Sequence, residues 1–516
     1  MSNSGEPVSE KRARSEWVAE ALALRLSQDG AGTLPQRLYE ALRGWIQDGE
    51  LTRNSPLPSS RRLAHSLGIG RNTVIAAMDR LVAEGFAVAR QGAGLFVADL
   101  PPPPASMTAH APMLGSSRFS QRGQALLAFC GTLSTNHRAF APGVPALDQF
   151  PRERWQRMLR RHQHRAQQDW FGYQTQGGLP ALKVALCDYL RLSRSVNCRP
   201  EQILITQGAQ QGFELIARLL ADRGDTVWLE EPGYGGAQAC FSMAGLNTVP
   251  VPVDEEGLHP GAVPREVPAP RLIYVTPSHQ YPSGVTMTMA RRLALLACAE
   301  RHEAWIIEDD YDSEFRYTTP PVASLQGLAE RMPVIYVGTF SKVLYPGLRL
   351  GYLVLPDGLI DDFRRANASL HREGQYVVQS ALAEFIADGH FARHVARMRT
   401  CYRQRQDCLR QALAPAVAQG LTLSKGQAGM HLVAMLDSLE QERHLVTRGH
   451  EQGITLSPLS CYYLSERKQP GLVLGYAGSS EAEITHAGRW LCEAWLQIAR
   501  AGPCESEGQA RCPPSR

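Results

Sequence analysis

Residues 338–352 read Gly-Thr-Phe-Ser-Lys-Val-Leu-Tyr-Pro-Gly-Leu-Arg-Leu-Gly-Tyr, and the fold assignment depends on them. They follow the apolar run Val334-Ile335-Tyr336-Val337, which is short enough for a buried strand, and they then break into Gly, Ser and Pro. Lys342 is therefore predicted to lie where a strand ends and a loop begins. A poorly solvated lysine there can lower its pKa and attack an aldehyde, which is Schiff-base chemistry. A lone Ser-Lys pair is more often a surface turn, so the rest of the chain has to decide.

The composition is that of a globular protein with two or more domains. A chain of 516 residues is too long for a single hydrophobic core, and a net charge of +4 excludes a histone-like basic protein. The eleven cysteines are scattered without a Cys-x-x-Cys pair, which indicates reduced thiols and predicts no metal site. Because the first residues are polar and no apolar run could span a bilayer, we expect a cytoplasmic protein without membrane contact.

Residues 33–100 have the pattern of two short helices about a glycine-containing turn, followed by a hairpin. The first helix of the pair starts after the cap Pro58-Ser59-Ser60, and the turn is Gly68-Ile69-Gly70. The second helix covers residues 71–82, and two strand-like runs flank Gln91-Gly92-Ala93-Gly94. This order predicts a helix-turn-helix with a wing.

The same stretch resembles the winged helix-turn-helix of the GntR family of bacterial regulators. The resemblance rests on residues 57–64, 71–74, 81–85 and 92–97. In this docking mode the start of the recognition helix reaches base edges in the major groove, and the preceding helix start holds phosphates through charge and backbone amides. The candidate residues for contact with double-stranded DNA are Ser59, Arg61, Arg71, Asn72, Thr73, Gly92 and Gly94.

The basic charge of this module is low. Residues 33–100 carry eight Arg against six Asp plus Glu, a difference of two. Arg62 and Arg80 are equally compatible with a solvated helix face. One module alone should bind weakly, so we expect two copies on two half-sites, which implies a homodimer.

A second domain follows a linker. Residues 101–125 open with four prolines and continue with Ala, Ser and Gly, so they are predicted to be the linker; residues 126–500 form the second domain, and residues 501–516 a polar tail. In the second domain, short apolar strands alternate with helices, which predicts an α/β fold with a mainly parallel sheet covered on both faces. Ligands of such sheets bind at the carboxyl ends of the strands.

The polar residues at these strand ends together suit pyridoxal phosphate. Gly208, Ala209 and Gln210 open a helix whose free amides favour a phosphate. Asp309 can pair with a protonated pyridine nitrogen, and Tyr311 can donate to the phenolate oxygen of the ring. The further candidates are Tyr234 for stacking on the ring, and Thr339, Ser341 and Arg349 for the phosphate. Each element alone is compatible with an ordinary turn or helix cap, but this combination in this order favours the cofactor.

Residues from Phe140 to about Arg500 resemble the fold-type I aminotransferases. The resemblance rests on residues 173–178, 207–210, 231–234, 282–284, 309–311 and 341–349. It implies that Lys342 forms the internal aldimine with the cofactor, and that the other candidates have the roles given above. It also implies that Tyr173 reaches the phosphate of the neighbouring subunit's cofactor, which again indicates a homodimer.

The whole layout, from about residue 33 to 500, resembles the MocR subfamily of GntR-type regulators. Two departures from the aminotransferase pattern bear on function. Tyr281 stands where aminotransferases place an asparagine for the phenolic oxygen, and Val473 stands where they carry an arginine for the substrate carboxylate. Because valine cannot make a bidentate pair with a carboxylate, ordinary amino-acid transamination is in doubt.

We therefore predict a transcriptional regulator that binds promoter DNA and senses a small amine, an amino acid or pyridoxal phosphate itself. The aminotransferase fold would serve sensing rather than turnover. An active aminotransferase with an accessory DNA-binding module remains the main alternative. A third possibility is a module that keeps the fold without a cofactor.

Overall fold

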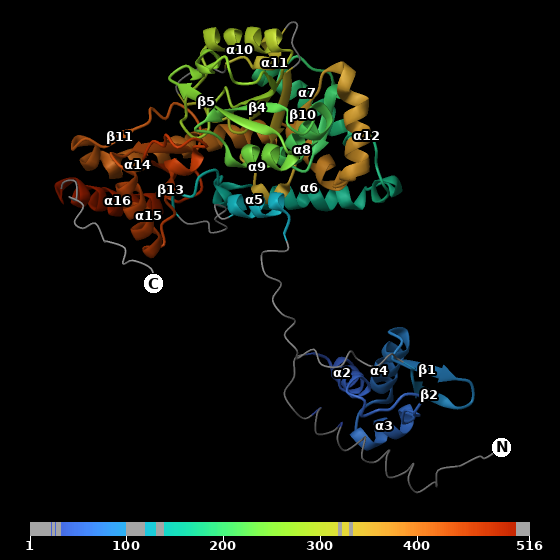
Figure 1. Ribbon diagram of the computed structural model, residues 1–516. Coiled ribbons are helices and arrows are strands. Elements are labelled where there is room, and N and C mark those ends of the chain that lie inside the picture. The colour runs from blue at the N-terminus through green and yellow to red at the C-terminus, as the bar shows by residue number, and fades with distance from the viewer. Residues whose placement is uncertain are drawn as a thin grey trace, which may run out of the picture. The chain divides into compact units, whose positions relative to one another are not determined.

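The computed structural model describes residues 32–99, 119–130, 139–317, 322–329 and 334–501, together with Leu22 and Leu26 (Figure 1). Internal contacts divide the chain into two compact units between Arg118 and Phe119. Most of the predicted linker and residues 502–516 of the predicted tail lie outside the described residues. Helix α5 (Gln121–Cys130) begins inside the stretch predicted as linker, and the exact domain boundaries stay predictions.

The first unit is a winged helix-turn-helix, which confirms the predicted fold. Buried leucine, valine and tryptophan side chains of three helices form its core. The Ser59 hydroxyl caps the middle helix by accepting a hydrogen bond from the Arg62 backbone N–H, and Gly68 ends that helix at φ +64°. The elements are α2 (Leu34–Gln47), α3 (Ser60–Leu67), α4 (Arg71–Ala83) and the antiparallel pair β1 (Ala87–Arg90) and β2 (Gly94–Val97).

The second unit is built on an eight-stranded, mainly parallel sheet, as predicted. Strands β4, β5, β7, β8 and β9 run parallel, while β10 is antiparallel to both of its neighbours. The spatial order is β3 (Ile203–Thr206), β10 (Gly351–Val354), β9 (Val334–Thr339), β8 (Trp305–Asp310), β7 (Pro270–Val275), β4 (Thr226–Glu231), β5 (Asn247–Asp254) and β6 (Gly257–Leu258).

Helices cover both faces of this sheet, because successive side chains of a buried strand point to opposite faces (Figure 1). Leu204 and Leu353 pack on one side with residues of α8 (Ala209–Leu220), α9 (Gly235–Ala244) and α12 (Ile360–Leu370). Their strand neighbours Ile205 and Val354 pack on the other side in a larger cluster. The helices there are α6 (Arg152–His164), α7 (Pro180–Arg194) and α13 (Tyr376–Ala387), and α10 (Met289–His302) packs beside β5 and β7.

A smaller sheet near the C-terminus packs against long helices. Its strands, in spatial order, are β11 (Thr422–Leu423), β12 (His431–Met435), β14 (Gly471–Gly475) and β13 (Ser457–Pro458). The helices are α14 (His390–Ala418), α15 (Leu439–Glu451) and α16 (Glu481–Ala501), and α14 lies along α16. A β-bridge from Phe140 to Gly475 joins the start of the second unit to this sheet.

One strand extends further than the sequence predicts. The run Trp305-Ile306-Ile307-Glu308 predicts a strand that ends at Glu308, but β8 continues through Asp309 to Asp310. The prediction was wrong because acidic residues rarely end a buried strand, whereas here one oxygen of each carboxylate is hydrogen-bonded to a buried side chain of another element. In the described part of the chain, no helix is long and apolar enough to cross a membrane, and no cluster of His, Cys, Asp or Glu could hold a metal ion.

Candidate ligand site at the strand ends

Lys342 lies directly after β9, in the turn that leads to β10. Its Nζ donates a hydrogen bond of 2.9 Å to the carbonyl oxygen of Gly143. Burial lowers the pKa of Lys342, while the carboxylates of Asp312 and Asp309 raise it. A Cβ at Gly143, which has φ +72°, would lie 2.8 Å from Nζ, so a larger residue there would displace the lysine amine. The lysine amine is therefore poorly solvated and lies near two carboxylates.

Asp309 faces the site from the end of β8. Its Oδ2 accepts a hydrogen bond of 2.6 Å from the Tyr274 hydroxyl, whereas Oδ1 is buried without a hydrogen-bond partner among the described residues. Burial raises the pKa of Asp309 to about 7, although the Tyr274 hydrogen bond and Lys342 lower it. A buried acceptor without a donor is unfavourable by about 1–3 kcal/mol. A bound cationic N–H group would supply the donor and favour the ionised carboxylate.

The two carboxylates beside Asp309 have other partners, because side chains alternate along a strand. Asp310 accepts a hydrogen bond of 3.2 Å from Arg194 Nε. Glu308 accepts hydrogen bonds of 2.9 Å from two backbone N–H groups at the start of α11 (Leu325–Leu328). Among these three neighbouring carboxylates, Asp309 is the one that faces Lys342.

Tyr311 is held by a histidine–aspartate pair. His279 Nδ1 lies 3.0 Å from Asp312 Oδ1 and 3.0 Å from the Tyr311 hydroxyl oxygen. Because a carboxylate accepts, Nδ1 must carry the proton, and the same N–H can be shared with the Tyr311 oxygen. The Tyr311 hydroxyl then keeps its own proton for another acceptor. Burial raises the pKa of Tyr311 well above its usual value, so the group is a hydrogen-bond donor at neutral pH.

Gly429 fits closely against His279. Its φ is +85°, and a Cβ there would lie 1.8 Å from His279 Cε1. Gly429→Ala is therefore expected to displace the histidine and to lower the free energy of unfolding by about 1–3 kcal/mol more than the backbone strain alone. Gly453→Ala is the matched control, since Gly453 has φ +73° with nothing within 4 Å. Urea unfolding of the two variants measures the difference; equal losses would contradict the close fit.

The residues predicted to bind a phosphate lie together at the start of α8. Gly208 precedes the helix with φ +96°, and a Cβ there would lie 3.6 Å from Arg349 Cζ. Gln210 Nε2 donates to the Tyr234 hydroxyl at 3.3 Å. Free N–H groups at a helix start together with a guanidinium favour an anion. The remaining members are Ala209 in the first turn of α8, and Thr339 and Ser341 beside Lys342, where Thr339 Oγ1 accepts from the Ser341 N–H at 3.2 Å.

Tyr281 is at the centre of an aromatic cluster on the same site. Its ring lies 6.0 Å from that of Tyr234, 5.8 Å from Tyr311 and 5.3 Å from the imidazole of His431. Its hydroxyl pairs with the Tyr462 hydroxyl at 3.1 Å. The position therefore contributes a large ring, and its polar group is already engaged.

Val473 packs against this aromatic cluster. It is buried in β14 with Val433 and Leu459, and Tyr462 packs against the three. His431, in the neighbouring strand β12, donates from Nε2 to the carbonyl oxygen of Pro282 at 2.8 Å, and burial lowers its pKa to about 3. Among these described residues the wall is therefore apolar, with a neutral histidine, and none of them offers a charge to a carboxylate.

Tyr173 does not join the other candidates. Its side chain is 84% exposed, and the Arg372 guanidinium lies 5.2 Å from its ring centroid. The candidates for DNA contact lie in the first unit, where Arg61, Arg71 and Asn72 are exposed and Gly92 and Gly94 form the wing turn at φ +76° and +100°.

Several residues of the site had no predicted role. His279 and Asp312 lie within residues 276–284 and 308–315, which resemble the MocR subfamily in particular, so a signal for both is present in the sequence. Gly143, Tyr274 and His431 carry no signal in the sequence, because each meets the site through contacts between distant segments. The roles of all the candidate residues stay predictions.

Comparisons with known proteins match both units. Residues 34–97 match the gntR family of bacterial regulatory proteins, and residues 140–489 match aminotransferase class I and II. The chain is 40% identical to the probable rhizopine catabolism regulatory protein MocR of Rhizobium meliloti, over 93% of this chain and 97% of that protein. The chain belongs to the MocR-type regulators of the GntR family.

Solved structures similar to the second unit of this MocR-type regulator include aminotransferases. The Pyrococcus horikoshii kynurenine aminotransferase in complex with PMP has 25% identity and a TM-score of 0.67, covering 75% of this chain and 99% of that chain. LysN, the α-aminoadipate aminotransferase of Thermus thermophilus complexed with N-(5'-phosphopyridoxyl)-L-leucine, has 27% identity and a TM-score of 0.65, covering 72% and 97%. The MocR-type regulator thus has a fold-type I aminotransferase domain that follows its winged helix in the sequence.

Proposed function

We propose that this protein regulates transcription by binding promoter DNA through its winged helix and by sensing a small amine, an amino acid or pyridoxal phosphate in its second unit. The observation that supports this proposal is that one chain holds both an exposed recognition-helix start at Arg71 and a buried lysine–carboxylate site at Lys342. The effector acts as a switch only if it binds two arrangements of the protein unequally.

The residues of the second unit fit pyridoxal phosphate as the resident cofactor. Asp309 Oδ1 lacks a hydrogen-bond donor among the described residues, and a protonated pyridine nitrogen would supply one. The start of α8 together with Arg349 suits the phosphate. When bound, this cofactor supplies an electrophilic carbon that exchanges one amine for another. Lys342 would hold that carbon, Tyr311 would donate a proton to the ring oxygen, and Tyr234 would cover the ring.

The proposal includes a homodimer. Tyr173 and Phe171 are both more than two thirds exposed, at 84% and 72%, which is unusual for aromatic side chains on the surface of a monomeric protein. A second copy would bury them, and Tyr173 would then reach the partner's phosphate site. Two winged helices in one dimer would also compensate for the low charge of each.

Arg71→Ala is expected to weaken binding to the protein's own upstream DNA by tenfold or more. Arg71 begins α4 and is exposed, so its guanidinium can form two hydrogen bonds to a guanine edge, worth about 1–3 kcal/mol. Arg71→Lys is the control, since lysine keeps the positive charge but lacks the paired N–H donors of the guanidinium. Gel-shift titration on the upstream and a scrambled duplex measures both. If Arg71→Lys retains full selectivity, Arg71 contacts phosphate only.

Titration of the holoprotein with candidate amines tests the function as a whole. The visible spectrum and the DNA footprint are followed together, and the amine that changes the spectrum is expected to shift the footprint. Absence of any sequence-selective binding would contradict the regulatory function.

An active aminotransferase is the second candidate, since Lys342, Asp309 and Tyr311 form an intact set. It requires steady conversion of an amino donor with a keto-acid acceptor, abolished in Lys342→Ala. The apolar wall at Val473 argues against an amino-acid donor, because nothing there can pair with its carboxylate. A single amine exchange without turnover would favour the regulator.

A further inference from the structure

Helix α6 of the second unit carries an unusually basic exposed face. Residues 152–165 hold six Arg and one Glu, a formal charge of 6 − 1 = +5, whereas the whole chain has +4. The winged-helix unit, with eight Arg and six acids over residues 33–100, has only +2. A higher density of positive charge than that of the winged-helix unit therefore lies outside the module that the family uses to contact DNA.

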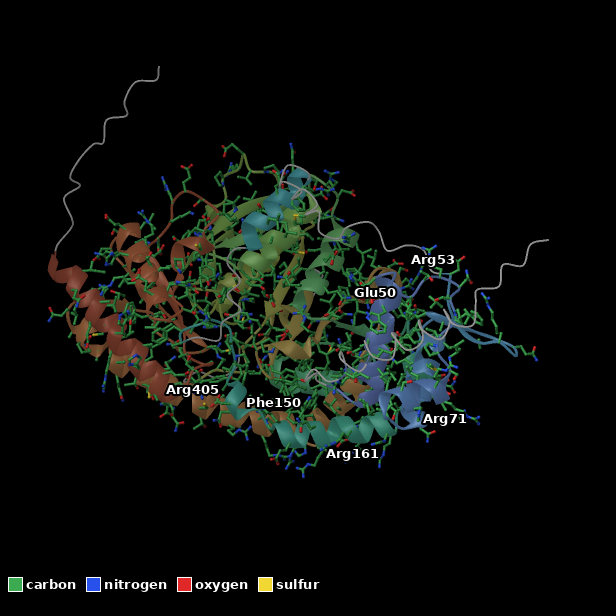
Figure 2. All side chains as sticks on the ribbon, turned by 90° about the horizontal axis from the view of Figure 1, so that it is seen from below. Glu50, Arg53, Arg71, Phe150, Arg161 and Arg405 are labelled. Atoms are coloured by element: carbon green, nitrogen blue, oxygen red, sulfur yellow. The ribbon has the colours of Figure 1, made fainter. Side chains whose placement is uncertain are left out.

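The buried face of α6 explains why the arginines project outward. Trp155 and Met158, three residues apart, are buried in the core, and Trp155 Nε1 donates to the Tyr345 hydroxyl at 3.0 Å. The opposite face is exposed and points away from the core (Figure 2). The exposed arginines of α6 and its C-cap are Arg152, Arg154, Arg157, Arg160, Arg161 and Arg165.

Most of this charge is not neutralised within the unit. Arg161 pairs with Glu384, but Arg157, Arg160 and Arg165 have no acidic side chain within ion-pair distance among the described residues. The face continues onto the start of α14, where His390 lies 2.9 Å from Arg154 and Arg393 is exposed. Burial lowers the pKa of the half-buried His162 imidazole on this helix, and the charges of Arg161 and Arg165 lower it further.

The stability of α6 does not account for these arginines. Cations favour the last turn of a helix, but Arg152 and Arg154 lie in the first turn, where the helix dipole disfavours them. Arg157 has like charges three residues before it and three and four after it, and such pairs destabilise a helix by about 0.2–0.5 kcal/mol each. A surface kept at this energetic disadvantage is expected to have an anionic partner.

We propose that the basic face of α6 binds the phosphate backbone of duplex DNA flanking the site that the winged helix recognises. This inference rests on the proposed regulatory function. Arginines spaced along one exposed helix face suit a regular row of phosphates, and no base contact is needed. Residues 100–118 span at most roughly 60–70 Å when extended, about the length of 20 base pairs, so the chain between the units is long enough for the second unit to reach flanking DNA.

The test compares two triple variants of the full-length protein. Arg157, Arg160 and Arg165 are replaced by glutamine in one, and the exposed Arg191, Arg265 and Arg301 in the other, so that both lose three charges. Each is titrated at several salt concentrations on two duplexes. The short duplex holds only the footprinted site, and the long one extends it by about 20 base pairs on each side.

On the long duplex, the α6 variant is expected to reduce the slope of log K against log salt by about 2–3, since each lost phosphate contact removes about 0.9. The short duplex should show no such change, and the control variant should behave as wild type on both. Equal slopes for wild type and the α6 variant, or equal reductions in both variants, would overturn the proposal.

Two further outcomes are distinguishable. If the α6 variant changes the oligomeric state in analytical ultracentrifugation, the face is a subunit interface and the proposal is wrong. If the wild type binds no duplex selectively, the proposed regulatory function fails. The slopes on a long duplex of random sequence then still decide whether α6 contacts phosphates.

Discussion

Lys342→Ala is expected to remove the visible absorbance of the purified protein and to reduce its retained cofactor by at least tenfold. The chain has five lysines, and Lys342 combines burial, a lowered pKa and two nearby carboxylates. Its loss also leaves Asp309 and Asp312 without their nearby cation. The site is therefore weakened electrostatically as well as by the loss of the covalent attachment. The measurement is the absorption spectrum with released pyridoxal phosphate quantified after denaturation.

Lys468→Ala is the matched control, because Lys468 is an exposed lysine of the same unit. It should keep the wild-type spectrum. Borohydride reduction of the wild type, followed by peptide mapping, is expected to place the added mass on the peptide that contains Lys342. Mass on another lysine, or an unchanged spectrum in Lys342→Ala, would contradict the assignment.

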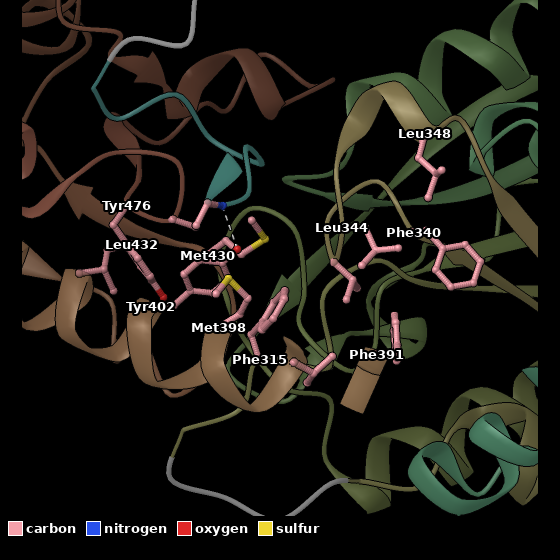
Figure 3. Close-up of a cluster of buried hydrophobic side chains, with 14 of the residues drawn as sticks. Phe315, Phe340, Leu344, Leu348, Phe391, Met398, Tyr402, Met430, Leu432 and Tyr476 are labelled. Carbon is pink, nitrogen blue, oxygen red and sulfur yellow. Dashed lines mark hydrogen bonds between the residues drawn. The ribbon is translucent and has the colours of Figure 1, made fainter. Parts of the chain in front are cut away.

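Phe315→Ala is expected to destabilise the second unit by about 3–5 kcal/mol. The Phe315 ring is completely buried and lies 4.8 Å from the Tyr402 ring at 73° (Figure 3). Tyr402 in turn accepts a hydrogen bond of 3.0 Å from the Ala146 N–H. The Phe315 ring therefore lies where three separate segments of the chain pack together. Removing it leaves a cavity that the surrounding strands and α14 can fill only in part.

Leu192→Ala is the control for this prediction, since Leu192 is 90% exposed and should change stability by less than about 0.5 kcal/mol. Urea unfolding followed by tryptophan fluorescence measures both variants. Because Phe315 lies three residues after Asp312, a cofactor titration shows whether the loss reaches the site. A stability equal to that of Leu192→Ala would mean that the cluster in Figure 3 can close over the gap.

The winged helix could be predicted almost residue by residue, because each of its parts depends on near neighbours. Ser59 caps α3 through a residue three positions away, and the wing turn needs glycines at Gly92 and Gly94. In the second unit the alternation of apolar strands and helices predicts the parallel sheet for the same reason. The end of β8 was missed, because the buried partners of Asp309 and Asp310 come from other elements.

The sequence by itself determined which chemical groups are present: a lysine at a strand end, a carboxylate and a tyrosine after another strand, and a glycine-led helix start. Only the tertiary structure decided how they are used. Gly143 accepts a hydrogen bond from Lys342 across 199 positions, and Gly429, in the segment before β12, leaves room for His279. Burial and contacts between remote segments lower the pKa of Lys342 and leave the Tyr311 hydroxyl proton available for another acceptor. Local spacing in the sequence encodes neither effect. The basic face of α6 follows the same rule, since its charges can be counted in the chain but only the packing of Trp155 and Met158 shows that they face outward together.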